Sequence, residues 1–207
     1  WGSYWGDKGY FYVSYYDSRI GAYNAVFPAA RPVTESTYIY QYDPLGWVVS
    51  YGFGSKTAWA ANIFTAVSAG NSLNGVSFYV TDTSASYQVK IYTGVSEGPT
   101  SGTLARTLSG TVTSSGYHTV SVSPAISLTP AEKFSVVLKL TNSNYLYPLA
   151  VEGPFGYASK ATASAGQSYV SADGATWTDL TTKYANTNVC LKALATGVSQ
   201  PYLHHFT

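Results

Sequence analysis

The amino-acid sequence predicts an all-β fold: a jelly-roll-like β-sandwich with an N-terminal strand extension. Three observations support this prediction. Short segments with apolar residues at every second position recur along the chain, as expected for strands with one buried face. Clusters of Gly, Pro, Asn and Asp separate these segments at short intervals. No segment shows the period of an amphipathic helix. Short strands in this arrangement are typical of two-sheet sandwiches.

The alternation is clearest at Val76, Phe78 and Val80, and equivalent sets occur within 86–93 and 134–142. Successive side chains of a strand point to opposite faces, so each set predicts one face directed toward the core. On these grounds we expect strands at 38–42, 47–53, 59–67, 73–81, 86–93, 103–112, 117–122, 134–142, 148–152, 167–172, 175–180 and 188–195.

A tight turn is predicted at Asp173-Gly174, between the expected strands 167–172 and 175–180. A two-residue hairpin turn of type I′ needs positive φ at both central positions, and Asp-Gly favours this. The pairing would place Trp177 nearly opposite Tyr169, which favours a structural role for both rings.

The composition favours a secreted or cell-surface protein. Charged residues make up 10% of the chain and methionine is absent, whereas an average soluble protein has about 25% charged residues. The net charge is +1 without a basic stripe, so nucleic acid is not an expected partner. No stretch has the length and apolar character of a membrane span. Surfaces with so little charge repel one another weakly, which makes association easy.

The sequence lacks the residues that thiol protease chemistry requires: a thiolate, an activating histidine and a group that orients it. The single cysteine, Cys190, lies in an apolar strand-like segment, and we interpret it as buried and inert. His118 is expected at a half-exposed strand position. His204 and His205 are adjacent near the C-terminus, where they would point to opposite sides and form a poor metal site. We therefore predict no catalytic residues.

Composition divides the chain into three zones. Residues 1–36 contain an aromatic strand-like segment and a linker with two prolines, 37–196 form the main domain, and 197–207 form a short tail.

The first ten residues follow the pattern W-G-x-x-W-G-x-x-G-Y. This pattern resembles the stretch after the catalytic asparagine of papain-like cysteine proteases. The position of that asparagine would lie before residue 1. The resemblance implies a fragment or processed product of a secreted protease, and it shifts the expected function from catalysis to binding or assembly.

A second resemblance covers residues 40–194. Segments that carry it include 40–47 (Tyr-Gln-Tyr-Asp-Pro-Leu-Gly-Trp), 133–141 and 188–193. They resemble the lectin-like domain found C-terminal to papain-like proteases of anaerobic bacteria and archaea. The resemblance implies an extracellular module that binds a glycan or another cell-surface partner, and it assigns no binding residue.

Aromatic side chains are candidates for a glycan site because sugar rings stack on flat aromatic faces. The loop 142–148 combines amide side chains with tyrosines. The candidate ligand-binding residues are Asn144, Tyr145, Tyr147, Trp47 and Trp59. Alternatively, these rings fill the core or form cross-strand pairs.

Metal binding has little support in the sequence. Calcium needs several converging oxygen ligands, whereas Asp43, Asp82, Glu152, Asp173 and Asp179 are scattered. Acids in turns usually bind their own backbone. We predict no cofactor or metal, with calcium as the alternative, and no motif supports paired carboxylates for glycoside hydrolysis.

The segment 10–16 predicts a different function, self-assembly. Its apolar members are Tyr10, Phe11, Tyr12, Val13, Tyr15 and Tyr16. An apolar strand without a partner tends to complete the edge of a sheet. The alternative function is therefore a structural subunit that donates this strand to a neighbour, since head-to-tail contacts that do not close build filaments. A third possibility is that the chain is the C-terminal piece of an intact protease.

Overall fold

The computed structural model describes residues 7, 8, 10, 12–14, 16 and 38–197. The chain divides into two units, Trp1–Pro32 and Val33–Thr207. In the first unit, Asp7 and Tyr10 exchange two backbone hydrogen bonds. Phe11 and Tyr15 of the predicted assembly strand lie outside the described residues, as do His204 and His205, so these predictions remain predictions.

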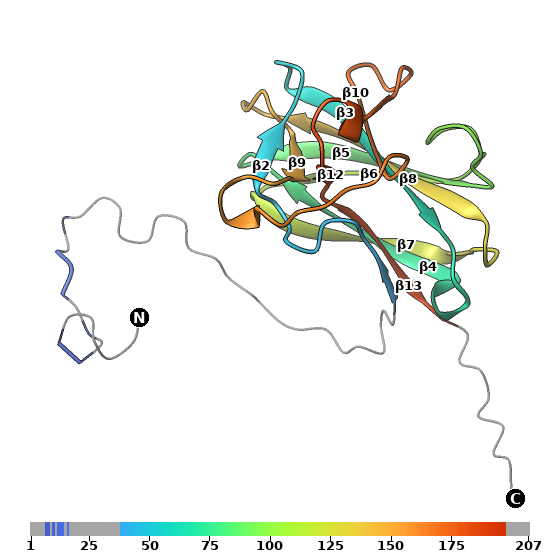
Figure 1. Cartoon of the computed structure of the whole chain (residues 1–207), viewed down its shortest axis with the longest axis horizontal. Helices are drawn as coiled ribbons and strands as arrows, with labels where there is room; N and C mark the ends of the chain where they lie inside the picture. The colour runs from blue at the N-terminus through green and yellow to red at the C-terminus, as the bar shows by residue number, and fades with distance from the viewer. Residues whose placement is uncertain (1–6, 9, 11, 15, 17–37, 198–207) are drawn as a thin grey trace, which may run out of the picture. The chain divides into compact units, whose positions relative to one another are not determined.

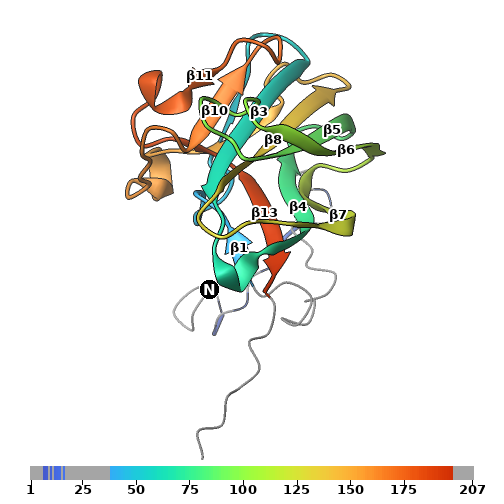
Figure 2. The same ribbon diagram turned by 90° about the vertical axis from the view of Figure 1, so that its right-hand side faces the viewer.

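The second unit is a sandwich of two antiparallel sheets, with a small third sheet beside them (Figure 1 and Figure 2). The four-stranded sheet has the order β1 (Tyr38–Tyr40), β13 (Leu191–Thr196), β4 (Ser72–Val80) and β7 (Gly116–Ser127). The six-stranded sheet has the order β11 (Thr178–Asp179), β10 (Ser168–Ser171), β3 (Thr57–Thr65), β8 (Lys133–Asn142), β5 (Ala85–Thr93) and β6 (Thr103–Val112). The third sheet contains β12 (Asn188–Val189), β9 (Leu149–Glu152) and β2 (Val49–Tyr51).

The core lies between the two larger sheets and follows the predicted alternation. Val76, Phe78 and Val80 of β4 are fully buried, and Val136 and Leu138 of β8 are buried in the same core. Each such side chain contributes about 1.5–3 kcal/mol to stability when it leaves water. The prediction of an all-β sandwich is confirmed.

Helical structure among the described residues is limited to three single turns of 3₁₀ helix. They are η2 (Ser68–Gly70), η3 (Gly156–Ala158) and η4 (Leu180–Thr182). No helix in this part of the chain has the length and apolar character needed to cross a membrane.

The strand predicted at 188–195 is divided in two. Asn188 and Val189 pair with β9 in the third sheet, whereas Leu191–Thr196 pair with β4 in the four-stranded sheet. Cys190 lies between them and donates its backbone N–H to Ala150. The division arises because one continuous segment changes partner, which an alternating pattern does not reveal.

The predicted two-residue turn at Asp173-Gly174 is wrong, although the hairpin exists. Tyr169 pairs with Asp179, not with Trp177, and the loop spans 172–177. The reason is local. The Asp173 carboxylate accepts hydrogen bonds from the backbone N–H groups of Ala175 and Thr176, so these residues cannot pair in a ladder.

Buried amides tie the two sheets together. The Asn62 side chain on β3 donates hydrogen bonds to the carbonyls of Val189 and Leu191, at 3.2 and 2.8 Å. Ser168 donates its hydroxyl proton to the side-chain carbonyls of Asn62 and Asn188. Because all three side chains are buried, these bonds fix the register of the sheets as well as their separation.

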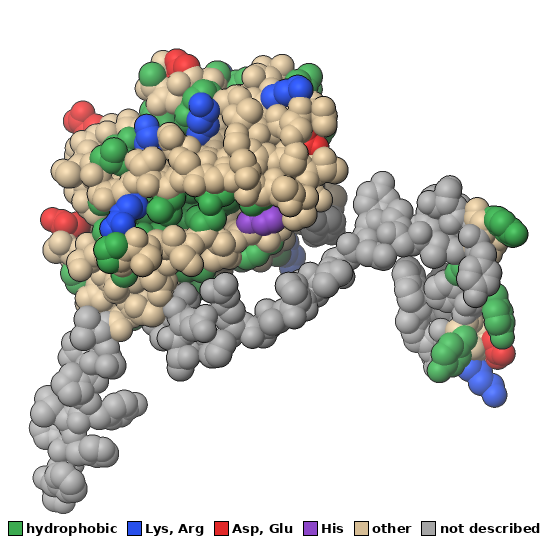
Figure 3. Space-filling view, turned by 180° about the vertical axis from the view of Figure 1, so that it is seen from behind, with side chains coloured by type: hydrophobic (Ala, Val, Ile, Leu, Met, Phe, Trp, Pro, Cys, Tyr) green, Lys and Arg blue, Asp and Glu red, His purple; other side chains and the backbone are tan. Residues whose placement is uncertain are grey.

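One side of the sandwich is open between β6 and β7 except at Arg106 of β6, whose guanidinium donates to the carbonyls of Ser123 and Pro124 of β7. These strands form the edges of the six-stranded and four-stranded sheets. Leu108, Val112 and Val120 are only partly buried there. Figure 3 shows a band of hydrophobic side chains across this side, with polar surface above and below it.

Candidate ligand-binding face

The outer face of the six-stranded sheet carries a row of polar and aromatic side chains. Trp59 on β3 pairs with Lys139 on β8, and Lys139 pairs in turn with Gln88 on β5. Ala58 and Ala60 face the core, so the alternation of the strand places Trp59 on the outer face. In the next row, Val137 pairs with Lys90.

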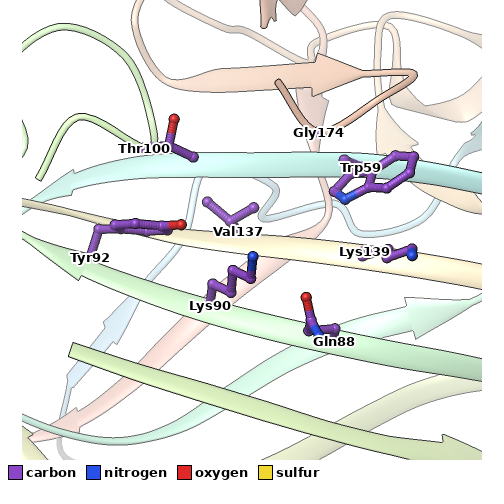
Figure 4. A pocket seen from close by; sticks show the side chains of 8 residues that line it. All are labelled: Trp59, Gln88, Lys90, Tyr92, Thr100, Val137, Lys139 and Gly174. Atoms are coloured by element: carbon purple, nitrogen blue, oxygen red, sulfur yellow. The ribbon is translucent and has the colours of Figure 1, made fainter. Parts of the chain in front are cut away.

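These rows form the floor of a shallow hollow, shown in Figure 4. Its lining residues are Trp59, Gln88, Lys90, Tyr92, Thr100, Val137, Lys139 and Gly174. The strands β3, β5 and β8 supply most of them, and two loops supply Thr100 and Gly174. A rigid sheet therefore presents side chains that can stack, donate and accept hydrogen bonds.

The Trp59 ring is held between two neighbours. Lys139 places its Nζ atom 5.0 Å from the centroid of the ring, a cation–π contact. Gly174 approaches the edge of the indole so closely that a Cβ atom there would lie 2.6 Å from Nε1. Gly174 also has a φ of +78°, which glycine tolerates best. The loop can approach Trp59 because residue 174 has no side chain.

The second loop is tied to the sheet beside Thr100. The Ser135 hydroxyl donates a hydrogen bond to the carbonyl of Pro99, and the backbone N–H of Val95 donates to the carbonyl of Lys133. Inside the loop, the Ser101 hydroxyl oxygen accepts from the backbone N–H groups of Ser96 and Glu97. These bonds give the hollow a preformed wall, which reduces the entropy lost on binding.

Five carboxylates in the described residues serve the protein's own backbone or a buried lysine. Asp82 accepts from the N–H groups of Asn144 and Tyr145, and these hydrogen bonds lower its pKa. Asp179 accepts from the N–H groups of Gly166 and Thr181. The expectation that turn acids bind backbone is confirmed for Asp82 and Asp173.

The remaining two, Asp43 and Glu152, belong to a buried cluster beside Lys192 of the four-stranded sheet, and Glu152 itself lies on β9 of the third sheet. Lys192 donates from Nζ to Asp43 Oδ2 at 2.7 Å, and Glu152 Oε2 accepts from the backbone N–H groups of Leu45 and Gly46. Burial raises the pKa of Asp43 and of Glu152, although the charge of Lys192 opposes this for both. These contacts hold the segment 40–47 over the outer face of the four-stranded sheet.

Within the described part of the chain, no group of three or more His, Cys, Asp or Glu side chains is placed to hold a metal ion. The alternative of calcium binding therefore stays a prediction without a site.

The five predicted ligand-binding residues lie on three separate surfaces. Trp59 lines the hollow. Trp47 packs against Tyr79 on the outer face of the four-stranded sheet, with ring centroids 6.1 Å apart. Asn144, Tyr145 and Tyr147 lie exposed in the 142–148 loop, where the two tyrosine rings meet edge to face at 5.5 Å.

Sequence reasoning missed the residues that surround Trp59 in the hollow. The alternation within 86–93 and 134–142 places Gln88, Lys90 and Lys139 on the faces opposite the apolar sets and assigns them no role. The register that aligns Trp59, Lys139 and Gln88 was the missing information, because strands far apart in sequence meet in one row.

A second group of exposed aromatic rings was also missed. Tyr51 lies 5.4 Å from Phe53 and 5.9 Å from Tyr184, between ring centroids. Together with Val49, Phe155 and Thr187, Tyr51 and Tyr184 line an apolar groove beside β2. Its lining carries no charge and few polar atoms, so it offers less chemistry for a hydroxyl-rich ligand than the hollow does.

The described residues bring no nucleophile and base together. Cys190 is buried, as predicted, and burial together with the negative charge of Asp43 raises the pKa of its thiol. A thiol with a raised pKa is not a nucleophile at neutral pH. His118 is half-buried and its Nε2 lies 2.9 Å from the carbonyl oxygen of Ser114.

Comparison with known proteins assigns the chain to a family. The model of the lectin-like domain family matches residues 39–195, so the chain belongs to that family. The matched residues form a lectin-like domain, and this matched part is not a catalytic domain. No sequence among curated proteins matches the chain.

Two solved structures are similar. One is the clostridial cysteine protease Cwp84 after propeptide cleavage, with 27% identity, a TM-score of 0.63 and 78% of this chain covered. The other contains the cysteine protease and lectin-like domains of Cwp84, a surface layer associated protein of Clostridium difficile, with 26% identity, a TM-score of 0.55 and 70% covered. The chain spans 40% and 33% of those chains. The resemblance to the lectin-like domain of a papain-like protease is confirmed.

Proposed function

We propose that this chain is a non-catalytic, extracellular lectin-like module that binds a cell-surface glycan at the hollow around Trp59. The observation that carries the proposal is the arrangement of that hollow. A tryptophan fixed by Lys139 and Gly174 stands beside an amide, two ammonium groups and a phenol on one rigid sheet. Stacking and hydrogen bonding to hydroxyl groups both need such side chains.

The relatives support an extracellular location. Cwp84 is described as a surface layer associated protein. In the proposed function, the module holds a papain-like protease, its parent, close to the surface on which the protease acts. The module without its parent protease would bind the same surface.

A glycan array followed by isothermal titration with purified surface polysaccharides tests the proposal. Trp59→Ala should weaken binding about tenfold, if a sugar ring on the indole is comparable with a base stacked on an aromatic ring, which contributes about 1–3 kcal/mol. Trp47→Ala is the matched control, since Trp47 is also half-buried but lies on the other sheet. If Trp47→Ala or the pair Tyr145→Ala and Tyr147→Ala abolishes binding while Trp59→Ala does not, the site is wrong. If the folded protein binds no glycan, the function is wrong.

The open side between β6 and β7 favours a second candidate function, assembly by strand donation. These edge strands span 10 and 12 residues and contain one charged residue, Arg106. Long edges with little charge accept additional strands readily. Tyr10, Tyr12 and Tyr16 of the proposed donor strand 10–16 are each more than three-quarters exposed.

Electron microscopy of the purified chain tests this second function. Filaments that disappear on deletion of residues 1–17, and on the substitution Val120→Lys between β6 and β7, would support strand donation at this side. Filaments that persist after the deletion would contradict the donor role of 10–16, and particles that remain monomeric in the intact chain would contradict assembly itself.

A further inference from the structure

We infer that the hollow around Trp59 is built for an acidic glycan, one that carries carboxylate or another anionic group on its sugar units. This inference rests on the proposed function and adds the class of ligand. It depends on the distribution of charge over the six-stranded sheet, which differs from the near-neutral balance of the whole chain.

The strands of that sheet are asymmetric in charge. β3, β5, β6 and β8 contain the cations Lys90, Arg106, Lys133 and Lys139 and no acid at all. Asp179, on the edge strand β11, is the one acid in the sheet, and its carboxylate accepts hydrogen bonds from backbone N–H groups. These four strands therefore carry positive charge alone. Arg106, on the edge strand β6, donates to the carbonyls of Ser123 and Pro124, so the lysines of β5 and β8 are the cations that remain for a ligand.

Two of these cations, Lys90 and Lys139, line the hollow. Within the described residues, neither forms an ion pair with a carboxylate; the ion pair found there joins Lys192 to Asp43. The acids nearest to the hollow in sequence are Asp173 and Glu97, which neighbour the lining loops. The Asp173 carboxylate accepts hydrogen bonds from two backbone N–H groups and the Ser171 hydroxyl, so its hydrogen-bonding capacity is used within its own loop.

The positions of the two lysines suit a single anion. Lys139 pairs with Gln88, and Lys90 pairs with Val137, two residues from Lys139 on the same face. Such diagonal neighbours are about 7–8 Å apart in an antiparallel sheet, and lysine side chains are long and flexible. A carboxylate between them can accept from both ammonium groups and from the Gln88 amide, while the sugar ring contacts Trp59.

A neutral glycan would fit this site less well. It would displace water from two ammonium groups without supplying a counter-charge, which costs free energy. An acidic sugar supplies that charge, and charge-assisted hydrogen bonds are about twice as strong as neutral ones. The same residues thus discriminate between ligands with equal shape and different charge.

Polygalacturonate and its methyl-esterified form provide matched probes, because esterification removes the charge and leaves the backbone intact. Isothermal titration of the full chain at low salt should give binding at least about tenfold tighter for the acid form. The preference should shrink as salt is raised, since small ions screen the contact.

The double substitution Lys90→Gln and Lys139→Gln should remove the preference. Lys160→Gln with Lys183→Gln changes the net charge equally at two exposed positions outside the hollow and should retain it. Circular dichroism verifies that both variants fold.

The possible outcomes distinguish a failure of the acidic preference from a failure of the proposed glycan binding. Equal affinity for both polymers, lost in Trp59→Ala, would overturn the acidic preference and leave glycan binding standing. Tighter binding to single-stranded DNA than to the acidic polymer would overturn the glycan as the ligand class. Absence of binding to every glycan in the array would remove the proposed function itself.

Discussion

Lys192 and Lys139 occupy equivalent positions in the two sheets, but their side chains have different surroundings. Each lies on a central strand between residues that face the core, Leu191 and Ala193 in one case, Leu138 and Leu140 in the other. Lys192 is covered by the segment 40–47 and donates three hydrogen bonds, to Gln41 and to two oxygens of Asp43. Lys139 is half-buried, and its Nζ lies over the Trp59 ring.

The comparison separates structural polar groups from those that remain available to a ligand. A buried cation must be paired, since removal from water costs several kcal/mol. A half-buried cation without a carboxylate partner, such as Lys139, keeps its hydrogen-bonding capacity for another molecule. The same residue type is therefore paired within the protein on one sheet and has no carboxylate partner among the described residues on the other.

The largest effect should come from Lys192→Met. This substitution leaves Asp43 buried, already with one carboxylate oxygen unpaired, and without its counter-charge. We expect a loss of about 3–5 kcal/mol in the free energy of unfolding, measured by urea denaturation. Lys139→Met is the matched control and should change stability by less than about 1 kcal/mol. Similar losses in both variants would show that the two lysines do not differ in this way.

Asn62→Leu should have the next largest effect. It removes the amide that donates to Val189 and Leu191 across the sandwich, leaving buried carbonyls unpaired. Unsatisfied buried groups cost about 1–3 kcal/mol each, so a total near 3 kcal/mol is expected. Gln88→Leu, an amide on the open face, should stay within about 0.5 kcal/mol. Denaturation curves of the two variants give the comparison directly.

Gly174→Ala should affect the open face more than the core. A Cβ atom would collide with the Trp59 indole and must adopt positive φ, at a cost of about 1–2 kcal/mol. We expect Trp59 to move, with altered tryptophan fluorescence and weaker glycan binding in a folded protein. Gly54→Ala has a similar positive φ but open space around it, and it should leave both signals unchanged. A Gly174→Ala variant with unaltered fluorescence and affinity would contradict the role of this loop.

The smallest effect concerns acid stability. Hydrogen bonds from the Thr176 and Ala175 N–H groups lower the pKa of Asp173 from 3.8 to about 2. Because the pKa is lower in the folded state, the ionised carboxylate stabilises that state at pH values above the ordinary pKa of 3.8. This stabilisation is lost as the pH falls toward 2. Asp173→Asn should therefore lower the melting temperature at pH 6, with a difference that narrows between pH 4 and pH 2.

Asp43 has the opposite effect on the pH dependence of stability. Burial raises its pKa, so its contribution to stability weakens as pH rises above the ordinary value for aspartate. Melting curves of the parent chain and the Asp173 variant across pH 2–7 separate the two effects, because Asp43 is common to both. A gap that stays constant at every pH would contradict the contribution of the Asp173 charge.

The sequence by itself determined the class of fold and most of the strands. Period-2 alternation identifies buried positions such as Phe78 and Leu138 because a strand turns successive side chains to opposite faces. The burial of Cys190 could be predicted for a different reason, because it lies in an apolar segment and free cysteine is usually buried. The two resemblances, to a papain-like protease and to its lectin-like domain, also came from the sequence.

Only the tertiary structure decided which polar residues bind the protein itself. Leu138-Lys139-Leu140 and Leu191-Lys192-Ala193 are nearly the same in sequence, and no local signal distinguishes their lysines. Lys192 meets Asp43 after a separation of 149 residues, and Lys139 meets Trp59 through strand register. Side-chain partners across sheets are set by the long-range packing of the chain, whereas local pattern sets only the face on which a residue lies.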